Sequence, residues 1–297
     1  MGCPDWPKCF GHLIPPISED QVVWAPDRYF EEGTMTIYQD TLWHSSFSGQ
    51  TDTVFNRDRW IPYLTHDYSK FVIKHTWIEY LNRLSGALSG IPALLLVLLA
   101  FLKRKTNKTT LILSIIALLG LGFEAWLGKK VVDGNLIPGQ ISIHMIGALV
   151  ICGLYAYIYS INSESARRSS SKGMLWFWVG LLLAQILIGI QVRESVDTAI
   201  HAHGFADADN IQNSAYFLIH RSIIWVWFLS VGLFWWKAPK PGRRIAILLL
   251  IWLIMEGLIG WVMSTTGLPH FSQPLHLLLA FIAFCFLIYH IGRKSIY

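Results

Sequence analysis

The sequence predicts an all-α membrane protein with two pseudo-repeated helix bundles and a long outer N-terminal segment. Three observations support this fold class: an apolar composition, seven apolar stretches of membrane-spanning length, and polar motifs that recur in both halves of the chain. Of 297 residues, 53% are hydrophobic and only 14% are charged, with a mean hydropathy of +0.43. Soluble domains carry about 25% charged residues, so the composition argues against a soluble enzyme and against a disordered chain.

Seven stretches have the length of about 20 mostly apolar residues that a bilayer crossing needs. The residues before them contain no apolar run and are rich in proline and aromatic side chains, which predicts one extramembrane segment over 1–72. The predicted spans are 74–102, 109–128, 140–160, 173–192, 213–236, 243–263 and 272–292.

Basic residues gather in every second link between these spans and at the C-terminus. By the positive-inside rule, this places residues 1–72 outside and the C-terminus inside. The net charge of +5 is then an orientation signal and gives no support for a nucleic-acid partner. The basic residues on the inner side are Lys103, Arg104, Lys105, Lys108, Arg167, Arg168, Lys172, Lys237, Lys240, Arg243, Arg244, Arg293 and Lys294.

The predicted topology requires the polar segment 1–72 to cross the membrane. No signal peptide with a charged region followed by an apolar region precedes it. We therefore expect an upstream helix that is absent from this sequence, with insertion of a free N-terminal tail as the alternative.

Cys3 and Cys9 lie in the predicted outer segment, separated by two prolines that bend the chain. Disulfides persist outside the cytoplasmic membrane, which favours a Cys3–Cys9 bond. Two free thiols and a redox-active thiol pair are the alternatives. Cys152 and Cys285 fall inside predicted helices and are interpreted as small apolar packing residues.

Several polar motifs occur twice, once in each half of the helical region. Each glutamate of the repeat precedes a histidine by 20 residues, and each of these histidines begins a helix from the outer side. We interpret the two glutamates as helix–helix hydrogen-bonding residues. The repeated motifs are Asn82-Arg83 with His220-Arg221, Glu124-x-x-x-Gly128 with Glu256-x-x-x-Gly260, and His144 with His276.

His220 and His276 fall in apolar helices, at matching depth near the outer face. Polar residues at membrane depth are expensive and are usually functional. Two imidazoles on facing helices are one way in which a bundle holds a haem iron. We therefore favour haem ligation over a hydrogen-bonded buried histidine, with Arg221 and Arg83 near haem propionates.

The two candidate sites are unequal. His220 and His276 would supply both axial ligands in the second half, as in an electron-carrying haem. The first half offers one histidine, His144, with Asn82 in place of the other. Glu79 lies three residues before Asn82, on the same helix face. An open site with an acid predicts chemistry on a bound substrate.

Segments from residue 2 to the last helix match one known family. They are Gly2-Cys3-Pro4-Asp5-Trp6-Pro7-Lys8-Cys9, Glu79-Tyr80-Leu81-Asn82-Arg83, the helix start at His144, His220-Arg221 and Pro274-Leu275-His276. With these segments the chain resembles haem A synthase, the bacterial and mitochondrial membrane enzyme that oxidises haem O. The resemblance covers nearly the whole chain, and its first segment is the most distinctive.

The resemblance implies eight helices in two four-helix halves, of which the family's first helix is absent here. It also implies haem b as cofactor and haem O as substrate, with Asn82 favouring a five-coordinate substrate iron on His144. The residues implied are His220, His276 and Arg221 for haem b, His144, Asn82 and Arg83 for the substrate haem, and Glu79 for catalysis.

The reaction implied is oxidation of one haem O methyl group to a formyl group by successive hydroxylations, for cytochrome oxidase biogenesis. The alternatives are a membrane cytochrome b and a haem carrier without catalysis. The implied location is the bacterial cytoplasmic membrane, and the implied partners are haem O synthase and the cytochrome oxidase assembly system, with a homo-oligomer left open. The expected organisation is an outer segment 1–72, a substrate-haem half 73–161, a cytoplasmic link 162–172 and a haem b half 173–297.

Overall fold

The computed structural model describes residues 2–64, 70–134, 139–163, 167–168, 172–203, 212–266, 271–293 and 295–296. The chain forms two compact units, Met1–Ala148 and Leu149–Tyr297, and the division between them falls inside a helix. Lys294, one of the basic residues predicted on the inner side, lies outside the described residues.

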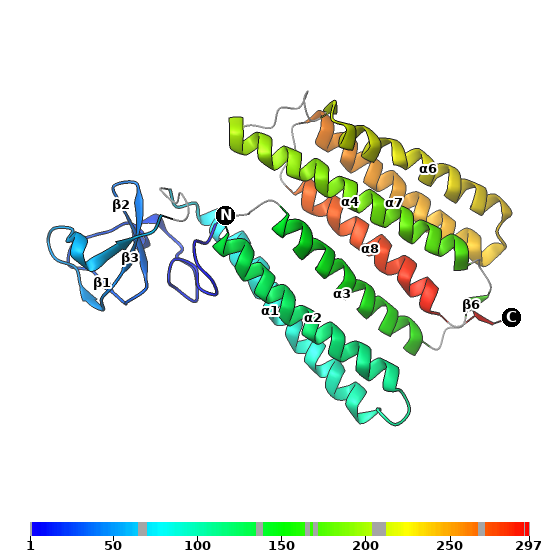
Figure 1. The fold of residues 1–297 in the computed structure, drawn as a ribbon, viewed down its shortest axis with the longest axis horizontal. Coiled ribbons are helices and arrows are strands. Elements are labelled where there is room, and N and C mark those ends of the chain that lie inside the picture. The colour runs from blue at the N-terminus through cyan, green and yellow to red at the C-terminus, as the bar shows by residue number, and fades with distance from the viewer. Residues whose placement is uncertain are drawn as a thin grey trace. The chain divides into compact units, whose positions relative to one another are not determined.

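Long helices make up most of the described chain (Figure 1). Seven of the helices within the described ranges are long and apolar enough to cross a membrane, so the protein is a multi-pass membrane protein. This confirms the predicted fold class. The helices are α1 (Ile73–Leu102), α2 (Lys108–Asp133), α3 (Gln140–Asn162), α4 (Lys172–His203), α6 (Ala215–Lys237), α7 (Lys240–Thr265) and α8 (Ser272–Gly292).

Helix boundaries follow the predicted spans closely, with one exception. The fourth helix, α4, continues to His203, well past the predicted end at residue 192. Hydropathy marks only the apolar part of a helix, and the polar residues that follow are mostly compatible with helix. Side-chain caps begin two of the others: Asn107 accepts from the Thr110 N–H at 3.1 Å, and Ser214 accepts from the Phe217 N–H at 3.3 Å.

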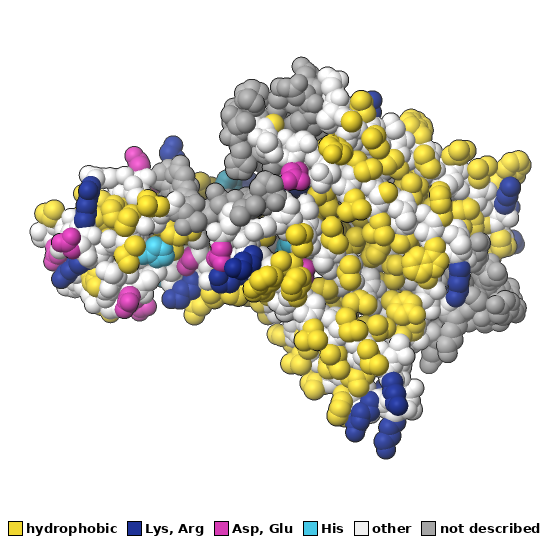
Figure 2. Space-filling model, viewed as in Figure 1, with side chains coloured by type: hydrophobic (Ala, Val, Ile, Leu, Met, Phe, Trp, Pro, Cys, Tyr) yellow, Lys and Arg dark blue, Asp and Glu magenta, His cyan; other side chains and the backbone are white. Residues whose placement is uncertain are grey.

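Hydrophobic side chains cover much of the helical surface, while basic side chains gather at the helix ends (Figure 2). Leu98, Leu102 and Ile112 are among the large apolar side chains that are more than half exposed. Such a surface is unfavourable in water and suits contact with lipid chains.

The segment before α1 contains short strands that the sequence analysis did not predict. Strands β2, β3 and β5 form an antiparallel sheet in that order, and β1 pairs with β4. The β2–β3 hairpin turns at Gln39 and Asp40, both with positive φ, as a two-residue type I′ turn requires. The strands are β1 (Tyr29–Phe30), β2 (Met35–Tyr38), β3 (Thr41–Ser45), β4 (Gly49–Gln50) and β5 (Trp60–Pro62).

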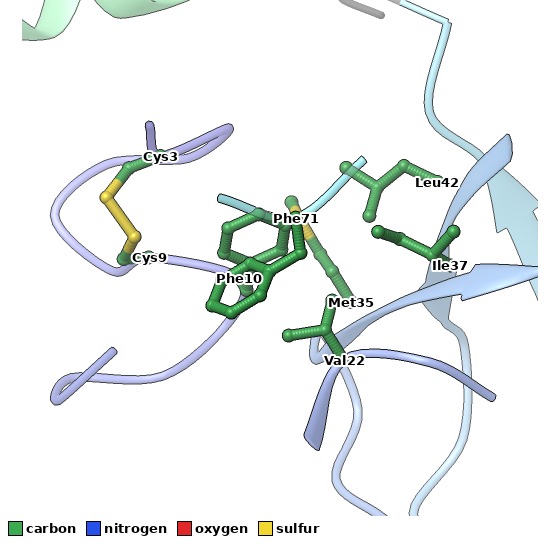
Figure 3. Packing of buried hydrophobic residues seen from close by; sticks show 8 residues of the cluster. All are labelled: Cys3, Cys9, Phe10, Val22, Met35, Ile37, Leu42 and Phe71. Carbon is green, nitrogen blue, oxygen red and sulfur yellow. A yellow bond between two sulfur atoms is a disulfide. The ribbon is translucent and has the colours of Figure 1, made fainter. Parts of the chain in front are cut away.

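Two buried clusters hold this segment together. The first includes the Cys3–Cys9 disulfide, which the sequence analysis predicted and which lies at one edge of the cluster (Figure 3). The second is aromatic, and its Tyr38 and Phe55 rings stack with centroids 4.0 Å apart. The first cluster comprises Cys3, Cys9, Phe10, Val22, Met35, Ile37, Leu42 and Phe71, and the second Phe30, Phe55 and Trp60 with Trp24, Tyr38, Trp43 and Phe47.

The stability of this segment should depend on pH through His44 in β3. Burial lowers the pKa of His44 more than nearby Asp5 raises it. The unfolded chain therefore binds the proton more readily, and the free energy of unfolding falls as the pH drops below about 6.5. We therefore expect amide hydrogen exchange in β2 and β3 to be faster at about pH 5.5 than at about pH 7.5, once the rates are corrected for the pH dependence of intrinsic exchange.

His44→Gln should reduce that difference, because glutamine does not titrate in this range. Equal corrected exchange rates at the two pH values in the unsubstituted protein would contradict this prediction.

Candidate functional site

The histidine pair predicted in the second half comes together in the unit Leu149–Tyr297. His220 on α6 and His276 on α8 have ring centroids 6.2 Å apart, with their planes at 70°. A metal–imidazole nitrogen bond is about 2 Å long, so two rings on opposite sides of one metal have centroids about 6 Å apart. The spacing therefore fits one metal ion between the rings.

The two rings are the ligand set that a haem iron needs from a protein, since the porphyrin supplies the other nitrogens. Within the described ranges no group of three or more His, Cys, Asp or Glu side chains could hold a metal ion.

His276 contacts a carboxylate on the neighbouring helix. Its Nδ1 lies against Oε2 of Glu256 on α7. Glu256 is buried, with 8% of its side chain exposed, and His276 is 27% exposed. Among the described residues, neither the Glu256 oxygens nor this Nδ1 has a hydrogen-bond partner, so the close approach of the two groups is their polar contact. The two side chains therefore depend on each other.

His220 contacts α4 instead. Its Nδ1 lies 3.1 Å from the backbone oxygen of Gln185, and the Gln185 amide donates to the His220 carbonyl at 2.8 Å. Gly189 follows one turn later. A Cβ at Gly189 would lie 2.9 Å from His220 Cε1, so the glycine provides the space that the imidazole occupies.

His144, the histidine of the first half, repeats the arrangement of His276. Its Nδ1 lies 2.6 Å from Oε2 of Glu124 on α2, and only 9% of the Glu124 side chain is exposed. Gly147 on α3 makes room for this carboxylate, because a Cβ there would collide with Glu124 Oε1. The predicted helix–helix role of Glu124 and Glu256 thus takes the form of contacts with histidine.

All three histidines meet a neighbouring helix through one pattern, a polar residue followed four positions later by glycine. The polar residue contacts Nδ1, and the glycine lies beside Cε1 of the same ring. The sequence analysis missed the third copy of this pattern. The three copies are Glu124-x-x-x-Gly128 with His144, Gln185-x-x-x-Gly189 with His220, and Glu256-x-x-x-Gly260 with His276.

Glu79 on α1 contacts the disulfide-closed loop, residues 2–9. Its Oε2 accepts from the backbone N–H groups of Gly2, at 2.5 Å, and Cys3, at 3.3 Å. Its Oε1 pairs with Arg83, one turn later. Arg83 in turn donates to the Asp5 carbonyl at 2.6 Å. The structure thus brings Glu79 and Arg83 together with the loop.

The other predicted residues take less constrained positions. Asn82 and Arg221 are exposed. The Arg221 guanidinium lies over the Phe217 ring, 5.7 Å from its centroid. In each half, an arginine thus contacts the side chain one turn before it, Glu79 in one case and Phe217 in the other.

These features define a class of protein: a multi-pass helical membrane protein whose bundles hold histidines against polar groups of neighbouring helices. The chain belongs to the family of cytochrome oxidase assembly proteins, whose family model matches residues 32–224. This membership confirms the resemblance seen in the sequence.

One similar relative is a haem A synthase from Wolbachia pipientis wMel, 29% identical over 122 residues. The match covers 38% of this chain and 35% of that protein, so the chain spans about a third of the length of this curated relative. No solved structure matches the chain.

Alanine substitutions at two glycines of α4 should have opposite effects on stability. Gly180→Ala meets open space and should stabilise the helix by about 0.5–1 kcal/mol. Gly189→Ala places a methyl group against His220 and should destabilise the protein by about 1–3 kcal/mol. Thermal unfolding in detergent measures both, and stabilisation of equal size at the two positions would contradict the proposed packing.

Proposed function

We propose that the protein is a haem A synthase, which oxidises one methyl group of haem O to a formyl group by successive hydroxylations for cytochrome oxidase biogenesis. The observation that supports this proposal is that the two halves of this chain offer unequal numbers of candidate haem-ligating histidines. The pair His220 and His276 has the spacing for one iron. His144 is paired with Glu124, and in the sequence repeat Asn82 stands at the position that corresponds to His220. A saturated site suits electron transfer, and an open site suits a substrate.

In this proposal His220 and His276 hold haem b. The Gln185 backbone carbonyl orients the His220 ring, and the Glu256 carboxylate orients the His276 ring, each by contact with the ring Nδ1 atom. Arg221 lies next to His220 in sequence and supplies a cation for a haem propionate. Haem b, when bound, would carry electrons away from the oxidised substrate.

The substrate haem O is assigned to His144 on α3, together with Asn82 and Arg83 on α1. Glu79 is assigned the catalytic role. Two hydroxylations and the loss of one water convert the methyl group to a formyl group; with water as the oxygen source the net change is R–CH3 + H2O → R–CHO + 4 H+ + 4 e−. A carboxylate beside the reacting group could take up protons that are released, and the electrons would leave through haem b to an acceptor outside this chain. The contacts of Glu79 with Gly2, Cys3 and Arg83 hold this carboxylate in one place.

The proposed location is the bacterial cytoplasmic membrane, with residues 1–72 outside and the C-terminus inside. A Cys3–Cys9 disulfide agrees with an oxidising compartment for this segment. Lys103, Arg104 and Lys105, at the other end of α1, agree with a cytoplasmic position. Haem O synthase and the oxidase assembly system are the proposed partners.

The function is tested by expressing the chain together with a haem O synthase and identifying the extracted haems by chromatography and pyridine haemochrome spectra. We expect haem A in cells that contain the unsubstituted protein. Glu79→Gln should lower haem A about 10²–10⁴-fold, the usual effect of a general acid or base, and leave the haem b spectrum intact. Haem b without any haem A would instead support an electron-carrying cytochrome.

Thr76→Val is the matched control for Glu79. The Thr76 hydroxyl donates to the Gly2 carbonyl at 2.9 Å, so this variant weakens the docking of loop 2–9 and keeps the carboxylate. We expect it to retain most haem A synthesis. An equal loss in Thr76→Val and Glu79→Gln would mean that Glu79 acts only by holding the loop.

A further inference from the structure

Glu256 is a carboxylate buried between apolar helices, and the proposed function uses its contact with His276 but not its charge. A charge at membrane depth is costly, and a buried carboxylate without a partner is strongly destabilising. Glu256 lies on α7 with 8% of its side chain exposed, and its contact is Nδ1 of His276. A helix–helix contact alone would not require a carboxylate, because a neutral amide has the same shape.

We propose that Glu256 is a positioning residue for haem b, which accepts the Nδ1 proton of His276 and sets the reduction potential of the haem through its negative charge. The inference rests on the proposed function, because it takes His276 as an axial ligand. It concerns the electron-carrying site and makes no claim about oxidation of the substrate.

The contact determines which imidazole nitrogen is available to a metal. A neutral histidine carries its proton on one ring nitrogen and offers the lone pair of the other. With Nδ1 against Glu256, His276 presents Nε2. Nδ1 of His220 lies against the Gln185 carbonyl, so His220 also presents Nε2. Both rings are thus prepared to bind one iron through the same nitrogen.

The two ligands have partners of different charge. His220 faces a neutral peptide carbonyl at 3.1 Å, whereas His276 faces a carboxylate. A carboxylate that accepts from a metal-bound imidazole makes the imidazole a more basic ligand. A more basic ligand and a nearby negative charge both favour the more positive, oxidised iron. Glu256 should therefore lower the reduction potential of haem b.

The first half contains the same glutamate–histidine contact at His144, its candidate haem ligand. Glu124 lies 2.6 Å from Nδ1 of His144, and Gly128 stands beside the ring as Gly260 does in the second half, each with a would-be Cβ 3.8 Å from Cε1. Because His144 and His276 are separate positions on separate helices, the recurrence argues that the glutamate serves the imidazole.

The test compares purified unsubstituted protein with Glu256→Gln in a spectroscopic redox titration of haem b. Glutamine keeps the size of the side chain and its carbonyl acceptor but removes the charge. We expect the low-spin haem b spectrum to persist. At a fixed ambient potential the ratio of reduced to oxidised haem b should rise about tenfold, which for a one-electron couple is about 59 mV.

Two further variants separate the carboxylate from general effects. Glu256→Asp retains the charge and should keep the potential closer to that of the unsubstituted protein. Glu194→Gln neutralises a carboxylate on α4, a helix that carries neither of the two ligands, and should leave the potential unchanged. If Glu256→Gln loses haem while Glu256→Asp retains it, this difference in haem content is the evidence that a carboxylate at this position is needed.

Two results would overturn the inference, and they are distinguishable. Haem b in the unsubstituted protein, with the same potential in Glu256→Gln, would remove only the role of Glu256. Absence of haem b from the unsubstituted protein would remove the proposed haem site together with the inference.

Discussion

An imidazole inside an apolar helix bundle must find a partner for the nitrogen that carries its proton, and this requirement organises both halves of the protein. Water is absent at that depth, so the partner must come from a neighbouring helix. His144 and His276 each meet a glutamate, and His220 meets a backbone carbonyl. The glycine one turn after Gln185 leaves room for the His220 ring, and the glycines one turn after the two glutamates lie beside the other two rings. The repeat in the sequence is therefore a repeat of the polar residue and glycine that contact each histidine ring.

A second set of contacts joins the polar segment to the membrane helices within the first unit. The loop closed by Cys3 and Cys9 docks on α1 through Glu79 and Arg83. The residue proposed as the catalytic base is thus also the acceptor for the loop's backbone N–H groups. Because the carboxylate that holds the loop is also the proposed catalytic base, variants such as Thr76→Val, which weaken the docking and keep the carboxylate, are needed to separate the two roles.

The sequence predicted the membrane spans well because length and hydropathy are local properties, and it predicted the histidine pair because both residues stand out in apolar helices. The predicted end of the fourth span, residue 192, falls short of the end of α4 at His203, because hydropathy does not mark the polar part of a helix. The β2–β3 hairpin was missed because its turn, Gln39-Asp40, lacks the usual glycine. The contact of Glu79 with loop 2–9 joins residues 77 positions apart, which no local pattern reveals. The contact of His220 with the Gln185 carbonyl was also missed, because any residue type supplies a backbone carbonyl. The Gln185-x-x-x-Gly189 pattern itself was visible in the sequence.

The central claim is that His220 and His276 bind one haem iron between them. Electron paramagnetic resonance of the oxidised, purified protein tests it most directly, since two axial imidazoles give low-spin ferric iron. The account predicts a low-spin signal that is lost in His276→Ala while the protein remains folded. A purely high-spin signal in the unsubstituted protein, or an unchanged low-spin signal in His276→Ala, would contradict it.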